Sequence, residues 1–425
     1  MDNTAYNIKR LRNKFLKSYH NDDLAAAQSE GEELIEYYKK NGITSMREYG
    51  SDLFNLACAY DEDGVCEKAC ELYRKAADAV VKGGGSESEK LSDIYNNLGI
   101  AHMQLHQNDT ALAYFKKCYN LMYTLNDGRG EGMTDACYNL GSAYKSLHRF
   151  ADAAQYYAKA LNSRVKKDIA YADNLYNMGL CYIETEDFEI GLDYMSKALE
   201  IYKGITANPD EYITALGIYA SVLYKVERYE SSLESYNTLI ELIKENYGSS
   251  QPYYANALSH LADCYAKLDK VEKAITLKQK AINVVKKSLG TSHIFYSSCL
   301  AELGGLYVRL REYGRAASLY SQALEIRSKI LGLDNEECID YIQTLANIYS
   351  VMQLYKKAED LLNYAINNLP QKNKCYGSLV LELVKLYMDM QDGEGLNRAY
   401  IIFNKIHPEK GFDEMLDMAE DLDIL

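Results

Sequence analysis

The chain has 425 residues, which is long for one compact core. Its hydrophobic fraction of 48% is too high for a disordered chain, and its content of only 4 prolines suits long helices. Its net charge of −14 opposes binding to the phosphate backbone of nucleic acids. No apolar run approaches the roughly 20 residues of a membrane span, and residues 1–10 lack the apolar core of a signal peptide, so we expect a cytoplasmic protein without a membrane span.

Residues 1–46 predict a degenerate helical hairpin that caps the N-terminal end of a repeat array. Ala27 and Leu34 fall 42 residues before Ala69 and Ala76, which are regular positions of the first strong repeat. A basic cluster at residues 9–17 is interleaved with apolar residues. This pattern favours a capping helix over a segment that contacts an anionic surface, because terminal repeats must present a polar outer face.

Residues 47–370 contain eight units of a repeat that is mostly 42 residues long. Each unit has a leading apolar residue that is followed directly by alanine or glycine. The leading residues are Leu56, Leu98, Leu140, Met178, Tyr219, Leu261, Leu303 and Leu345. A second small residue recurs later in each unit at Ala69, Ala111, Ala153, Gly191, Ser232, Ala274, Ala316 and Ala358, with spacings of 42, 42, 38, 41, 42, 42 and 42.

The spacing within a unit predicts a helical hairpin. Gly141 and Tyr144 share one face of a first helix, and Ala153 and Tyr157 share one face of a second, with turn-like residues at 147–149 between them. Small residues allow two helix backbones to approach closely, and each hairpin must stack on its neighbours to bury its apolar face. We therefore predict an all-α, right-handed superhelical solenoid of antiparallel helix pairs with nine to ten hairpins.

Residues 371–425 predict a degenerate ninth unit and an acidic capping helix. Leu383, Tyr387, Leu396 and Tyr400 keep the internal spacing of the repeat. Residues 413–425 combine six acidic residues with methionines and leucines and contain no basic residue. This tail is consistent with a short helix that caps the array or with a segment that folds back into a groove.

The order of small, tyrosine and alanine positions in eight units resembles the tetratricopeptide repeat. The unit of 42 residues, in place of the usual length of about 34, is similar to the long-repeat group typified by kinesin light chain, as are the linkers at 289–293 and 331–335. The resemblance implies a scaffold that binds a protein or peptide, without a cofactor or a metal. No phosphate-binding loop, nucleophile elbow or paired-cysteine metal motif is present, so we do not expect an enzyme.

The residue before the leading position is asparagine in the first four units: Asn55, Asn97, Asn139 and Asn177. First helices of stacked hairpins line a concave groove, where an amide can bond both the N–H and the C=O of an extended peptide. Peptide-binding tetratricopeptide proteins use asparagines in this column, so the resemblance implies an asparagine ladder here, with side-chain pockets beside Tyr138 and Tyr176. The alternative is that these asparagines cap neighbouring helices or bond one another between repeats.

The asparagine column ends after the fourth unit, and a second column becomes basic. Its members are Lys225, Lys267 and Arg309, and Asn347 is expected in the same part of the groove. This strip predicts contacts with acidic residues of a partner, although a solvated rim explains the lysines equally well. Two other functions stay open from the sequence: a regulatory receptor for a short signalling peptide, as in bacterial pheromone receptors with similar arrays, and an enzyme built on a helical array.

Overall fold

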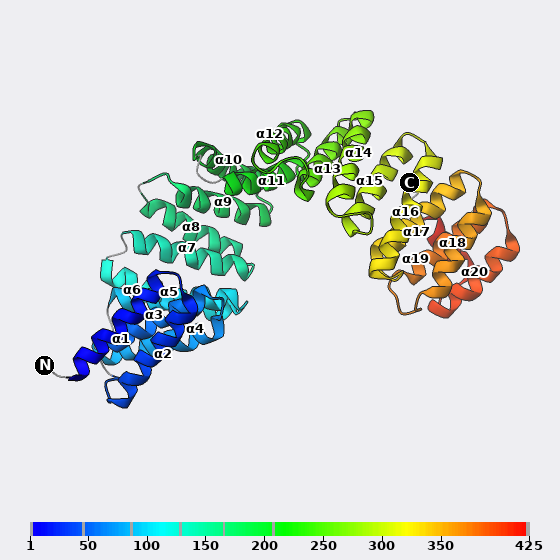
Figure 1. Ribbon diagram of the computed structural model, residues 1–425. Helices are drawn as coiled ribbons and strands as arrows, with labels where there is room; N and C mark the ends of the chain where they lie inside the picture. The colour runs from blue at the N-terminus through cyan, green and yellow to red at the C-terminus, as the bar shows by residue number, and fades with distance from the viewer. Residues whose placement is uncertain are drawn as a thin grey trace. The chain divides into compact units, whose positions relative to one another are not determined.

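The computed structural model describes residues 3–44, 47–85, 88–126, 130–164, 166–205 and 209–421. Within these ranges the chain forms 21 α-helices and no strand, which confirms the predicted all-α repeat fold. Successive helices pair into antiparallel hairpins, each with an odd-numbered first helix and an even-numbered second helix, and α21 follows the last pair (Figure 1). The chain divides into two compact units, Met1–Ala215 and Leu216–Leu425.

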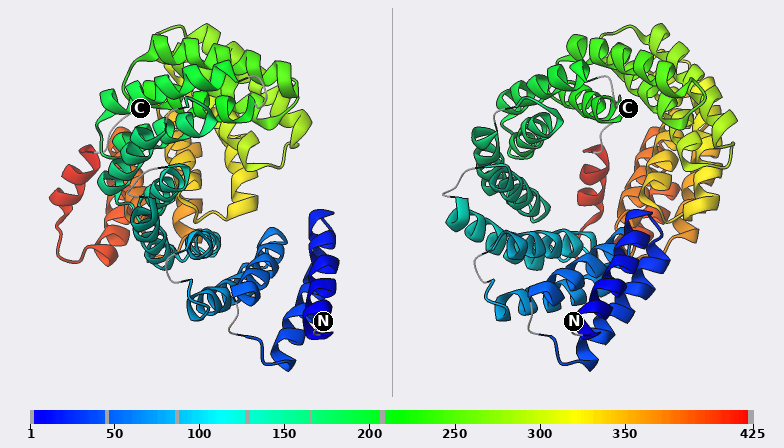
Figure 2. Two further views of the ribbon diagram at one scale, coloured as in Figure 1. Left: turned by 90° about the vertical axis from the view of Figure 1, so that its left-hand side faces the viewer. Right: turned by 60° about the vertical axis from the view of Figure 1, so that its left-hand side comes forward.

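The first unit contains five hairpins and the beginning of α11. Its helices are α1 (Asn3–His20), α2 (Leu24–Lys40), α3 (Arg47–Glu62), α4 (Cys66–Lys82), α5 (Glu89–Gln104), α6 (Asn108–Asn126), α7 (Glu131–Ser146), α8 (Phe150–Ser163), α9 (Ile169–Glu184) and α10 (Phe188–Gly204). Each helix packs on the next one in the chain, and the first helices α3, α5 and α7 also contact one another in sequence. Together with the hydrogen bond from Lys145 of α7 to Asn177 of α9, these contacts place the first helices α3, α5, α7 and α9 next to one another (Figure 2), and we call the side that they share the first-helix face.

The second unit continues the same pattern. Its helices are α11 (Pro209–Lys225, which spans the division), α12 (Tyr229–Tyr247), α13 (Pro252–Lys267), α14 (Val271–Ser288), α15 (Ile294–Arg309), α16 (Tyr313–Leu331), α17 (Glu336–Val351), α18 (Tyr355–Asn368), α19 (Tyr376–Asp389), α20 (Gly393–Ile406) and α21 (Phe412–Glu420). Pro209 and Pro252 open their helices, where proline lacks only a donor that would have no helical partner.

Close contact between the two helices of a hairpin explains the small residue after each leading position. A Cβ atom at Gly141 would lie 2.8 Å from the ring of Tyr157, and one at Gly304 would lie 2.9 Å from the ring of Tyr320. Tyr157 and Ala153 are fully buried. The aromatic ring of the second helix thus lies directly against the backbone of the first, and any side chain larger than glycine at Gly141 or Gly304 would displace it.

Each hairpin turn has a residue in the left-handed region of the backbone. His148 has φ of 56°, and Asp269 and Arg311 have φ of 56° and 59° at the equivalent turns. In the first of these turns the Arg149 amide donates to the Tyr144 carbonyl at 2.9 Å, which satisfies a carbonyl at the end of α7. The predicted turn at 147–149 is therefore present.

The helices at both ends of the described chain pack on their neighbours. Arg12 of α1 reaches into the core, where its guanidinium contacts the carboxylate of Asp52 at 2.8 Å and the Tyr38 hydroxyl at 2.6 Å, and Asp52 is only 2% exposed. At the other end, Met415 and Ala419 of α21 are fully buried against the last hairpin. The predicted alternative for the tail, a segment in a groove, concerns in part residues 422–425, which lie outside the described ranges.

Candidate functional site

The asparagine column lies on the first-helix face of the first unit, with one member on each of α3, α5, α7 and α9. All four side chains are half-buried. Asn97 donates to the Tyr73 hydroxyl of the preceding hairpin at 3.4 Å, and Asn139 donates to the side-chain amide oxygen of Asn96 on the preceding first helix at 2.7 Å. Asn55 makes no side-chain hydrogen bond to the other described residues. Hydrogen bonds between repeats therefore occupy part of the capacity of these amides.

Asn177 lies at the centre of a denser polar group, which we call the Lys145 cluster: Tyr138, Lys145, Asp173, Tyr176 and Asn177. The Lys145 ammonium donates to the Asn177 amide oxygen at 2.5 Å. The Asn177 amide nitrogen donates to the Asp173 backbone carbonyl at 2.9 Å and the Tyr138 hydroxyl at 3.4 Å. The cluster joins α7 to α9 across the boundary between two repeats.

Two members of the Lys145 cluster lack full compensation. Burial lowers the pKa of Lys145, and no carboxylate among the described residues pairs with it. The Tyr176 hydroxyl is enclosed without a hydrogen-bond partner in the described chain, and burial raises its pKa to about 12. Burial also raises the pKa of Asp173, whose carboxylate accepts from the Tyr202 hydroxyl at 2.6 Å. An unpaired cation and an unpaired hydroxyl are unusual in a half-buried position, because each has lost water without gaining a full set of partners.

In the second unit, the ladder residue Glu302 belongs to an ion network that we call the Lys278 network: Ser259, Asp263, Lys278 and Glu302. The Lys278 side chain is 1% exposed, and its ammonium lies 2.8 Å from Asp263, 2.6 Å from Glu302 and 2.6 Å from the Ser259 hydroxyl. Burial acts to lower the pKa of Lys278, but the two carboxylates outweigh it and raise the pKa above its usual value. The network crosslinks α13, α14 and α15.

Sequence reasoning missed this network, although a signal was present. Lys278 falls four residues after the small position Ala274, where other units have the buried Tyr157 and the half-buried Tyr320. A lysine in an aromatic column has to find carboxylates nearby if it is to be buried. Glu302 stands in the ladder column of the next unit and supplies one.

Three pairs follow the same rule: the aromatic-column residue of one hairpin contacts the ladder residue of the next. Tyr73 accepts a hydrogen bond from Asn97, and Lys278 pairs with Glu302. In the hairpin before Lys278, the ring of Tyr236 stacks on His260, with ring centroids 5.6 Å apart. The ladder column is therefore coupled to packing between repeats.

The structure brings together part of the predicted basic strip. Lys267 and Arg309 line one depression of about 320 Å³, but Lys225 does not line it. Arg309 donates to the Ala266 carbonyl at 2.7 Å and lies 3.4 Å from Asp269, so its charge is partly engaged at the end of α13. Asn347 lies on α17, half-buried, beside Glu382.

The described part of the chain lacks the features of a metal site and of a membrane-spanning helix. There, no group of three or more histidine, cysteine, aspartate or glutamate side chains is arranged to hold a metal ion. None of the described helices has both the length and the apolar character of a membrane-spanning segment.

Family models of the tetratricopeptide repeat match residues 51–124, 90–166, 210–287 and 253–329, and a second model of this repeat matches residues 172–204. The chain is a tetratricopeptide repeat protein. The matches cover more than half of the sequence and include both structural units, which confirms the family predicted from the repeat columns. A search of curated protein sequences gives no match.

Solved structures of other tetratricopeptide proteins are similar in fold. The C-terminal part of a repeat-containing protein from Cytophaga hutchinsonii has 17% identity and a TM-score of 0.50, over 68% of this chain and 98% of that one. The apo form of RapI has 16% identity and a TM-score of 0.48, over 95% and 98%. Kinesin light chain repeats from Podosopora anserina have 17% identity and a TM-score of 0.42, over 48% and 100%. At such identities the likeness concerns the fold alone.

Proposed function

We propose that this tetratricopeptide repeat protein binds an extended polypeptide segment along the first-helix face of its first unit, as a scaffold and not as an enzyme. The observation that carries the proposal is the Lys145 cluster beside the asparagine column. Lys145 is a desolvated cation without a carboxylate, and Tyr176 has an enclosed hydroxyl without a partner. A peptide that supplied a carboxylate at this place would pair with the Lys145 ammonium.

The asparagine column would hold the peptide backbone. Each amide has two N–H donors and an oxygen with two lone pairs, and the bond from Asn139 to Asn96 uses only one donor of Asn139. Asn55 is unused by the described residues. The remaining donors and acceptors recur at the spacing of the repeat, so they suit the regular N–H and C=O groups of an extended chain. Acid side chains or a terminal carboxylate of the same peptide would pair with Lys145.

The proposal can be tested by selecting peptides from a random library for binding to the whole protein. The affinity of a selected peptide is then measured by titration calorimetry. Changing Asn97 and Asn139 together to alanine should reduce the affinity for the selected peptide by about tenfold, which corresponds to about 1.4 kcal/mol of binding free energy. Lys145→Met should abolish the preference for peptides with an acid residue. It should leave the free energy of unfolding unchanged or raise it, because a desolvated cation is removed.

Asn367→Ala provides the matched control, because Asn367 is an exposed asparagine on α18, a second helix of the other unit. Its affinity for the selected peptide should equal that of the wild type. If the Asn97 and Asn139 variant and the Lys145 variant both bind as tightly as the control while folding normally, the column serves packing alone and the proposal is wrong. Selection of peptides of only a few residues would favour a receptor for a short signalling peptide over a scaffold for long segments.

A further inference from the structure

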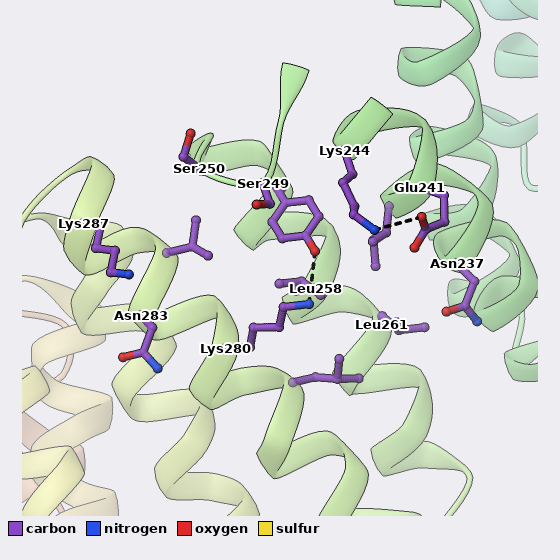
Figure 3. A pocket seen from close by; sticks show the side chains of 14 residues that line it. Asn237, Glu241, Lys244, Ser249, Ser250, Leu258, Leu261, Lys280, Asn283 and Lys287 are labelled. Atoms are coloured by element: carbon purple, nitrogen blue, oxygen red, sulfur yellow. Dashed lines mark hydrogen bonds and ion pairs between the residues drawn. The ribbon is translucent and has the colours of Figure 1, made fainter. Parts of the chain in front are cut away.

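A groove separates the second helices α12 and α14 of the second unit, and it has a volume of about 600 Å³. Its floor is apolar and is formed by Leu258 and Leu261 of α13. Lys244 lies on the α12 wall, and Lys280 and Lys287 lie on the α14 wall (Figure 3). We call this the α12–α14 groove. Its lysines surround an apolar floor in a chain whose net charge is −14.

The two lysines of the α14 wall have no carboxylate partner in the described part of the chain. Lys280 donates to the Tyr254 hydroxyl at 3.1 Å, and Lys287 makes no hydrogen bond or ion pair there. Lys244 differs, since it lies 3.4 Å from Glu241 on its own helix. The α14 wall therefore presents two positive charges that nothing in the groove neutralises.

The same groove recurs elsewhere in the repeat, and there the lysines that correspond to Lys280 or Lys287 are paired. In the next repeat, 42 residues on, Lys329 occupies the place of Lys287 and lies 2.6 Å from Glu325. In the first unit, the groove between α2 and α4 has Lys75 in the place of Lys280, and Lys75 pairs with Glu71. The groove is thus a general feature of stacked hairpins, whereas the α12–α14 groove differs in that the lysines at these second-helix positions have no carboxylate partner among the described residues.

The loss of pairing has a simple origin in the sequence. In the other grooves, a glutamate four residues earlier on the same helix neutralises the lysine, an arrangement that stabilises helices. On α14 those two positions are Thr276, which precedes Lys280, and Asn283, which precedes Lys287. Both replacements remove a carboxylate and leave the lysine in place. The charge of this groove is therefore a property of α14 and not of the repeat.

We propose that the α12–α14 groove is a second binding surface, which takes an acidic peptide segment of a partner protein. An aliphatic side chain of the segment lies on Leu258 and Leu261, and its carboxylates pair with Lys280 and Lys287. The apolar floor excludes a polyphosphate or nucleic acid backbone, which offers no group that gains from burial there. Charge complementarity with two uncompensated lysines selects acidic over neutral segments.

A short fluorescein-labelled peptide that alternates glutamate pairs with single leucines is a direct probe. Its binding to the whole protein is measured by fluorescence anisotropy. Its glutamine analogue should bind at least several-fold more weakly. The double variant Thr276→Glu and Asn283→Glu supplies the missing carboxylates. It should reduce the affinity for the acidic peptide by about tenfold and reduce the salt dependence of binding. Because these glutamates are favourable on the helix, the variant should melt at the same or a higher temperature.

Lys329→Gln is the matched control, since it removes a lysine from the neighbouring groove that is already paired; it should leave the affinity for the peptide unchanged. The Asn97 and Asn139 alanine variant should also bind the peptide as the wild type does, because that face belongs to the proposed function and not to this groove. The proposal is overturned if the double glutamate variant binds equally well, if the glutamine analogue binds equally well, or if inorganic phosphate displaces the peptide at similar concentrations.

Discussion

Removing charge from the two sides of the Lys278 network should have unequal costs. Lys278 is 1% exposed, whereas the side chains of Asp263 and Glu302 are 35% and 43% exposed. In Lys278→Met the carboxylates that remain can turn to water, so the lost ion pairs should lower the free energy of unfolding by only about 1–2 kcal/mol. In the double variant Asp263→Asn and Glu302→Gln, the ammonium stays enclosed without a counter-charge, and the loss should be about 3–5 kcal/mol.

The pH dependence gives an independent reading of the same difference. The folded-state pKa of Lys278 is raised, so the stabilisation of the wild-type network is present below the ordinary pKa of lysine and is lost as the pH rises through the folded value. Without the two carboxylates, burial should depress the pKa instead. The deficit of the double variant should then shrink as the pH rises towards the ordinary lysine pKa.

Urea unfolding followed by circular dichroism, at neutral and alkaline pH, measures both effects on the whole chain. The change in the slope of the transition should be small, because neither variant alters the surface that unfolding exposes. If the double variant unfolds at the same or a higher urea concentration than Lys278→Met, or if its deficit grows with pH, then the carboxylates do not stabilise the buried ammonium and the reasoning is refuted.

Three further predictions concern the core, the basic strip and a buried acid. Ala153→Leu should overpack its hairpin and destabilise the protein by about 1–3 kcal/mol, and an unchanged melting temperature would show that the position is not enclosed. Changing Lys225, Lys267 and Arg309 to glutamate should weaken the binding of an acidic partner and reduce the salt sensitivity of binding. An equal affinity by calorimetry would show that these residues are ordinary surface charges. Burial raises the pKa of the Glu382 carboxyl, although Lys385 and Asn347 act to lower it, so the stabilising contribution of Glu382 is present below the ordinary glutamate pKa and is lost as the pH rises through the folded value. The melting temperature of Glu382→Gln should therefore depend less on pH than that of the wild type between acid and neutral solution. An unchanged dependence would contradict this.

Much of the fold could be predicted from the sequence, because one period specifies both helix faces of every hairpin. Gly141 and Tyr157 fall at fixed places in the repeat, and their close contact follows from their spacing. The division of the chain within α11 has only an indirect signal: the asparagine column ends after Asn177 and the spacing there departs from 42 residues, while the other repeat columns continue. Regular columns describe what each hairpin buries, and they say less about where a stack divides into compact units.

The candidate site was less predictable, because its properties depend on pairs of residues from different repeats. The asparagine column was visible, but the bond from Asn139 to Asn96 depends on how two first helices stack. Lys145 fits no column of interest in the sequence, and its significance comes from the absence of a nearby carboxylate among the described residues. Neither burial nor an unpaired charge can be read from the period of the repeat alone.

The contacts between aromatic-column and ladder residues limit how such an array can change during evolution. Repeat arrays lengthen and shorten by duplication and deletion of whole repeats. A duplication or deletion boundary between Lys278 and Glu302 would separate a buried ammonium from its counter-charge. A boundary between Tyr73 and Asn97 would cost only a weak hydrogen bond. Recombination should therefore be tolerated more readily among the early hairpins than around α14, so that the ionic hairpins are inherited together as one block.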